Sequence, residues 1–156
     1  MKEKNHPGIY IPPPIIYAAF FFFSIFLQLL KPINSDWLSN PIMHVLSFAL
    51  LLLFFLFSFP SFRLFFVSNN TLLTIKPATS LMTRGIYRIS RNPMYVSLIC
   101  LYLALAIWFG NSWTFILLPL LIYVVRYYII GREEKYLTRR FGEEYESYQS
   151  KVRRWI

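Results

Sequence analysis

Residues 41–60 read PIMHVLSFALLLLFFLFSFP, and no charged residue stands between the two terminal prolines. A helix needs about 20 consecutive, mainly apolar residues to cross the hydrocarbon core of a bilayer. The closing Pro60 lacks a backbone N–H, so we expect the helix to end there. The stretch therefore predicts a membrane-spanning helix over residues 41–59.

Three more apolar runs lie on either side of this stretch. Residues 11–30 form the first, with three prolines at its start, where a missing N–H costs least. No small-residue cleavage site follows Leu30, which argues against a removable signal peptide. The other two runs, residues 93–109 and 113–130, are joined only by residues 110–112, and so short a link predicts an antiparallel helical hairpin.

The composition leads to the same class of protein. Of the 156 residues, 56% are hydrophobic and only 15% are charged, which excludes a soluble two-domain enzyme and a disordered tail protein. Cys100 is the only cysteine, so no internal disulfide can form. No second His or Cys stands at the spacing of a metal site from His44. The sequence predicts an all-α integral membrane bundle of one domain, with lipid neighbours and with neither metal nor nucleic acid as a partner.

Lysine and arginine are concentrated in alternate connections. Five lie between the second and third spans and seven follow the fourth, while Lys2 and Lys4 precede the first; the other two connections hold only Lys31. Cytoplasmic loops carry such an excess, so four spans with both termini in the cytoplasm fit the count. Trp37 and Trp113 would then lie at the outer interface, where indole rings are favoured.

The loop before the third span ends in TSLMTRGIYRISRNPMY, residues 79–95. Arg84, Arg88 and Arg91 have helical spacing, so one helical turn would place them on one face. Tyr87 would lie beside them. A basic face of this kind can simply hold anionic lipid headgroups at the membrane surface.

Asn92 and Pro93 have two interpretations. Asn is a favoured N-cap and Pro a favoured first helical residue, so the pair can simply start the third span. Alternatively, the unpaired N–H groups at that helix start can hold a carboxylate, with Arg91 reinforcing the attraction. The sequence leaves both interpretations open.

The tail, residues 131–156, has an apolar residue every three or four positions, which predicts an amphipathic helix against the membrane or the bundle. An interfacial anchor explains this stripe but not Glu133 and Glu134, directly after a span. Glu134 falls on the apolar face, so its carboxylate needs a partner: Arg126, a loop arginine or a bound cation. The stripe consists of Leu137, Phe141, Tyr145, Tyr148, Val152 and Trp155.

Together these segments resemble the membrane-embedded methyltransferase superfamily that includes isoprenylcysteine carboxyl methyltransferases and phospholipid N-methyltransferases. The resemblance covers roughly residues 71–155. The number of predicted membrane spans is that of a small, bacterial-type member of the superfamily. Eukaryotic relatives usually have His in place of Asn92 and Gly in place of Ser97, which leaves the methyl acceptor open. The motifs are Gly85-Ile86-Tyr87-Arg88, Arg91-Asn92-Pro93-Met94-Tyr95, Glu133-Glu134, Leu137, Phe141-Gly142, Tyr145, Tyr148 and Val152-Arg153-Arg154-Trp155.

The resemblance implies that residues 71–95 and 131–156 enclose S-adenosylmethionine on the cytosolic side. Arg91 would then bind the carboxylate and Glu134 the ammonium of the cofactor's amino acid end, with tyrosine faces near the sulfonium. A lipophilic acceptor would enter from the bilayer, and Arg126 or Arg88 would hold it if it is anionic. The implied cofactor residues are Tyr87, Arg91, Asn92, Pro93, Tyr95, Glu133, Glu134, Tyr145 and Tyr148.

Two other functions compete with this one. The first is a small non-enzymatic membrane protein whose basic face binds anionic lipid or a partner. The second is a membrane reductase, because sterol reductases are similar in the same C-terminal region, although they are much longer. The methyltransferase interpretation needs few polar residues, since the cofactor supplies both the reactive carbon and the leaving group.

Overall fold

The computed structural model of the chain describes residues 7–67 and 80–156. These two ranges contain helices and no strand, so the prediction of an all-α fold is confirmed. Lys2, Lys4 and Lys76, which entered the prediction of orientation, lie outside the described residues, as do residues 71–79 of the predicted cofactor loop.

Four apolar helices form the bundle. They are α1 (Pro13–Leu30), α2 (Pro41–Val67), α3 (Pro93–Trp108) and α4 (Ser112–Val124). The first two, and the continuous helix that begins with α4, are long and apolar enough to cross a membrane, whereas α3 is apolar but shorter. This arrangement is that of an integral membrane protein.

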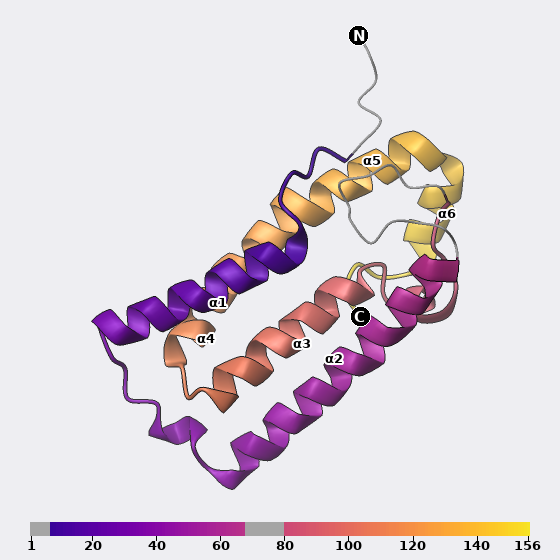
Figure 1. Ribbon diagram of the computed structural model, residues 1–156. Coiled ribbons are helices and arrows are strands. Elements are labelled where there is room, and N and C mark those ends of the chain that lie inside the picture. Colours follow the sequence, from indigo (N-terminus) through magenta and orange to yellow (C-terminus); the bar gives the residue numbers. More distant parts are fainter. Residues whose placement is uncertain (1–6, 68–79) are drawn as a thin grey trace.

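The helices pack in two pairs, α2 along α3 and α1 along α4 (Figure 1). A π-helical turn, Val125–Ile130, continues α4 directly into α5 (Gly131–Phe141), and α6 (Glu143–Lys151) follows. The end of α2, the start of α3, α5 and α6 all lie at one end of the bundle, which we call the basic end (Figure 1). The described parts of the predicted lysine- and arginine-rich segments that precede α3 and follow α4 meet there.

Helix α2 does not end at Pro60, and the prediction of that boundary is wrong. The helix continues through the proline to Val67. Proline is tolerated within membrane helices where nearby hydroxyl groups satisfy the disturbed backbone. Next to the proline, the hydroxyl of the buried Ser61 donates to the carbonyl oxygen of Phe57 at 2.7 Å in the same turn, which adds a hydrogen bond to the helix beside the one that Pro60 removes. The extra length carries α2 out to the loop that precedes α3.

The C-terminal amphipathic segment is two helices, not the single helix that was predicted. Gly142 has a φ of 52°, a left-handed value that ends α5 and reverses the chain into α6. The reversal packs Tyr145 and Tyr148 against Tyr87 of the loop before α3. The hydroxyl of Tyr148 donates to the carbonyl oxygen of Tyr87 at 2.6 Å, which fixes α6 on that loop.

A buried polar network joins α1 to α4 at the opposite end of the bundle. Ser24 and Thr114 are fully buried, and their hydroxyl oxygens lie 2.9 Å apart. Asn111 donates from Nδ2 to Ser24 at 3.0 Å, and its Oδ1 accepts from the backbone N–H of Trp113. Asn111 therefore caps α4 and ties it to α1 at the same time.

Asn111→Ala is expected to destabilise the bundle by about 1 to 3 kcal/mol, because it removes a helix cap and leaves a buried hydroxyl with one partner fewer. Thermal unfolding of the detergent-purified protein measures the effect as a lower midpoint. Gln149→Ala, at an exposed position of α6, is the control. An Asn111→Ala midpoint equal to that of the control would contradict this role.

Candidate functional site

The π-helical turn determines which way α5 faces. The N–H of Gly131 donates to the carbonyl oxygen of Arg126, five residues earlier. Such a turn adds one residue to the helix and is frequent at functional sites. Ile129 and Ile130 are fully buried in the core, and Glu133 and Glu134 follow within one turn. The charged helix α5 thus begins with two carboxylates turned toward the bundle.

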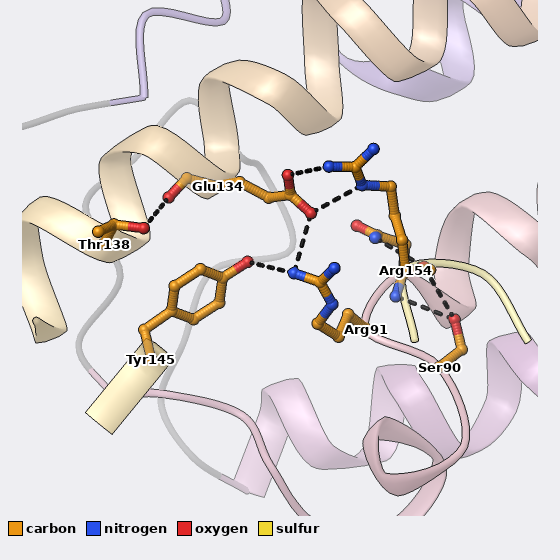
Figure 2. A network of polar contacts seen from close by, with 7 residues as sticks. Ser90, Arg91, Glu134, Thr138, Tyr145 and Arg154 are labelled. Atoms are coloured by element: carbon orange, nitrogen blue, oxygen red, sulfur yellow. Dashed lines mark hydrogen bonds and ion pairs between the residues drawn. The ribbon is translucent and has the colours of Figure 1, made fainter. Parts of the chain in front are cut away.

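Glu134 is held between two arginines from distant parts of the chain (Figure 2). Its Oε1 lies 3.0 Å from Nη1 of Arg91, which precedes α3. Arg154, which follows α6, donates from Nε to Oε1 at 2.9 Å and from Nη2 to Oε2 at 2.7 Å. The Glu134 side chain is only 13% exposed, so these charge-assisted hydrogen bonds are largely shielded from solvent.

Arg91 is the more deeply buried of the two arginines. Its side chain is 9% exposed, and Nη1 also donates to the hydroxyl of Tyr145 at 3.3 Å. Nε of Arg91 is buried and has no hydrogen-bond partner among the described residues. A buried guanidinium N–H without an acceptor is costly, so it marks a position for an anionic or polar group.

The residues after α6 are bonded to the loop before α3. The backbone N–H of Arg91 donates to the carbonyl oxygen of Arg153 at 3.0 Å. Nδ2 of Asn92 donates to the carbonyl oxygen of Arg154 at 2.9 Å, and Ser90 donates to the same oxygen at 3.4 Å. Asn92 does occupy the N-cap position of α3, followed by Pro93, but its side chain makes no cap bond there.

Glu133 has a different environment from Glu134. Tyr95 of α3 donates to its Oε2 at 2.7 Å, and no ion pair to Glu133 occurs among the described residues. The residue is partly buried just beyond the apolar part of the span. Burial raises the pKa of Glu133 to about 7, and the nearby charge of Glu134 acts in the same direction, against the Tyr95 hydrogen bond.

Three tyrosines pack together on one side of this group of charges, where Tyr145 contacts Arg91. Tyr87, Tyr145 and Tyr148 form a buried cluster, in which the rings of Tyr145 and Tyr148 have centroids 6.2 Å apart. Burial raises the pKa of Tyr145 to about 12, so its hydroxyl keeps its proton at neutral pH. The tyrosines therefore offer aromatic faces and neutral hydroxyls next to two carboxylates and two guanidiniums.

The loop arginines do not share one face, and that prediction is wrong. Only residues Gly85–Arg88 form a 3-10 turn, and Arg91 lies beyond it. Arg84 and Arg88 are exposed, whereas Arg91 is buried against Glu134. The single short turn cannot keep the spacing of an α-helix over seven residues.

Arg126 is exposed on the π-helical turn, with its guanidinium 5.5 Å from the ring centroid of Tyr127. Neither Arg126 nor Arg88 makes an ion pair with the described acidic residues. Both lie outside the network around Glu134. The described residues contain no group of three or more His, Cys, Asp or Glu side chains able to hold a metal ion.

Comparison with known proteins gives the family. The sequence model of the family described as phospholipid methyltransferase matches residues 42–144 of this chain. The chain belongs to the phospholipid methyltransferase family. This family is part of the isoprenylcysteine carboxyl methyltransferase-like superfamily, so the predicted resemblance is confirmed, and membership indicates a membrane methyltransferase.

A second similarity is to a shorter protein. An uncharacterized protein of Haemophilus influenzae is 44% identical over 63 residues, which are 40% of this chain and the whole of that protein. No solved structure matches the chain significantly. The family match includes Arg91, Glu133 and Glu134, whereas Tyr145 and Arg154 lie beyond its end.

Sequence reasoning did not assign Arg154 to the site. The residue stood within the closing motif of the resemblance, but nothing in its spacing connects it with Glu134, 20 positions earlier. The reversal at Gly142 brings the two together. A glycine between two amphipathic segments was the one signal that could have suggested this contact.

Proposed function

We propose that this membrane methyltransferase uses S-adenosylmethionine and methylates a lipophilic acceptor that reaches the basic end from the bilayer. The observation that carries the proposal is the buried Arg91, ion-paired to Glu134 and with Nε lacking an acceptor in the described part of the chain. A site for the amino acid end of the cofactor needs such a cation and anion side by side.

The remaining side chains suit the rest of the cofactor. Tyr87, Tyr145 and Tyr148 present aromatic faces, which attract a sulfonium as they attract other cations. Asn92, Pro93 and Tyr95 line the same end of α3. When bound, S-adenosylmethionine supplies the methyl group and the leaving group, so the protein has to position two reactants and to exclude water.

The acceptor would lie between the network and the lipid. The family name indicates a lipid substrate, and a lipid could leave its tail in hydrocarbon while its polar end meets the basic end of the bundle. Arg126 is exposed on the turn that leads into α5, and Arg88 is exposed on the loop before α3. We propose these two arginines as the groups that hold an anionic acceptor.

We also propose that the basic end faces the cytoplasm and that both termini are cytosolic. The described connections at this end carry most of the lysines and arginines, and the excess of these residues marks cytoplasmic loops. Trp37 and Trp113 lie at the other end, where Trp113 donates from Nε1 to the carbonyl oxygen of Lys31 at 2.8 Å.

The proposal predicts that the detergent-purified chain binds S-adenosylhomocysteine, the product form of the cofactor, in a saturable manner. Isothermal titration calorimetry measures this binding. Lys151→Ala, an exposed position on α6, should bind as the unmodified chain does. Absence of binding up to millimolar concentration, in protein shown to be folded, would contradict the proposal.

A further inference from the structure

The side chains that α5 exposes are all positively charged. They are Arg132, Lys135, Arg139 and Arg140. The two carboxylates of the same helix are only partly exposed, and neither ion pair of the described chain includes one of the four exposed cations. Helix α5 therefore presents positive charge at its surface, with no exposed acidic side chain of its own to offset it.

Three of these cations lie on one face of the helix. Arg132, Lys135 and Arg139 follow one another at intervals of three and four residues, which places them in one row along α5. We call this row the basic stripe. Nη1 of Arg132 donates to the carbonyl oxygen of Gly8 at 2.7 Å, and its guanidinium lies 4.3 Å from the ring centroid of Tyr128. These contacts hold the first cation of the stripe in place, so less conformational freedom is lost when it binds a ligand.

The length of the helix places the basic stripe at the membrane surface. From Ser112 to Phe141 the chain forms one continuous helix of 30 residues. At 1.5 Å per residue this helix is about 45 Å long. The hydrocarbon core is about 30 Å thick, so about 20 residues cross it. Trp113 begins the helix at the opposite interface, and the residues from Arg132 onward therefore lie at the level of the lipid headgroups.

Helix stability does not explain the whole basic stripe. Cations in the last turn of a helix are favoured by its dipole, which accounts for Arg139 and Arg140. Arg132 and Lys135 stand in the first half of α5, where the dipole offers no such gain. The exposed glutamates of this region are grouped in the first turn of α6 instead of alternating with the cations of α5. The charges are thus separated by helix, and the basic helix is the one that continues a membrane span.

We propose that the basic stripe binds the headgroups of anionic phospholipids in the leaflet around the basic end. Lysines and arginines directly beyond a membrane span attract anionic lipids, and each one near the surface contributes roughly a fivefold gain in association. The guanidiniums can also bind a headgroup phosphate through two hydrogen bonds. The stripe is distinct from Arg126 and Arg88, the residues proposed for the acceptor, and it needs no cofactor. It would concentrate anionic lipid beside the site.

Electron paramagnetic resonance of spin-labelled lipids measures this binding. The full chain would be reconstituted in phosphatidylcholine vesicles without cofactor, and the association of labelled phosphatidylglycerol compared with that of labelled phosphatidylcholine. We expect the unmodified chain to prefer phosphatidylglycerol by about threefold or more. The preference should fall in about 1 M salt, where the Debye length shortens to about 3 Å.

Paired substitutions locate the binding surface. Lys135→Gln combined with Arg139→Gln removes two charges from the basic stripe and should lower the preference by roughly half or more. Lys151→Gln combined with Arg153→Gln removes the same charge from exposed positions outside α5 and should leave the preference unchanged. Lys135→Arg combined with Arg139→Lys keeps the charge of the stripe and should retain the preference.

Three results would overturn the proposal: no preference for phosphatidylglycerol in the unmodified chain, a preference that high salt does not reduce, or an equal fall in the two charge-removing variants. The last result would show that the preference reflects the net charge of the chain and not the basic stripe. Unfolding midpoints in detergent establish that each variant is folded. Because no cofactor is present, these results are independent of whether the chain binds S-adenosylhomocysteine.

Discussion

Glu134→Gln is expected to have the largest effect of any substitution in the site. The carboxylate is the one described anion that contacts both Arg91 and Arg154, and its loss leaves two guanidiniums side by side at low exposure. Removing one partner of a buried ion pair typically costs about 3 to 5 kcal/mol. We therefore expect both a lower unfolding midpoint and an affinity for S-adenosylhomocysteine reduced by an order of magnitude or more.

Thermal unfolding and calorimetry on the same preparation measure the two effects of this substitution. Glu144→Gln is the control, because it makes the same chemical change at an exposed position of α6. Equal stability and equal affinity of the Glu134→Gln and Glu144→Gln proteins would show that Glu134 does not organise the site.

Arg91→Ala is expected to reduce the affinity for S-adenosylhomocysteine by an order of magnitude or more. It removes a charge-assisted hydrogen bond to the ligand, which contributes about 1.5 to 3 kcal/mol. Arg91→Lys should restore little of this affinity. Arginine can use Nη1 for Glu134 and Nε for a ligand, whereas lysine has a single nitrogen that cannot take both positions. Calorimetry of the two variants gives the comparison.

Lys151→Ala is the control for Arg91, as an exposed cation on α6 whose loss removes a similar charge. Full restoration of affinity by Arg91→Lys would indicate that only a positive charge is needed there. Equal affinity of the Arg91→Ala and Lys151→Ala proteins would place the ligand elsewhere in the bundle.

The sequence predicted the helical bundle well because its signals are local. An uninterrupted apolar run can satisfy its backbone in a membrane only as a helix, so residues 41–59 had no alternative structure. The boundary at Pro60 failed because a proline does not have to end a helix inside a membrane. Proline usually ends a helix because it lacks an N–H group. In this helix the hydroxyl of Ser61 adds a hydrogen bond to the carbonyl oxygen of Phe57 beside the proline.

The site was only partly predictable, since its contacts join distant segments. A carboxylate on an apolar face at a membrane boundary needs a cation, and this requirement led to Glu134 and the loop arginines. The choice of Arg91 over Arg88 follows from where the 3-10 turn ends, which spacing alone does not reveal. The contact between Glu134 and Arg154 depends on the positive φ of Gly142, the backbone conformation of a single residue.

An experimental structure of the full chain in lipid, with S-adenosylhomocysteine bound, tests the proposed site most directly. We expect the ligand at the basic end, with its carboxylate within hydrogen-bond distance of Arg91 and its sulfur beside the Tyr87, Tyr145 and Tyr148 cluster. A ligand bound away from Arg91, with the Arg91–Glu134 pair separated by water, would contradict it.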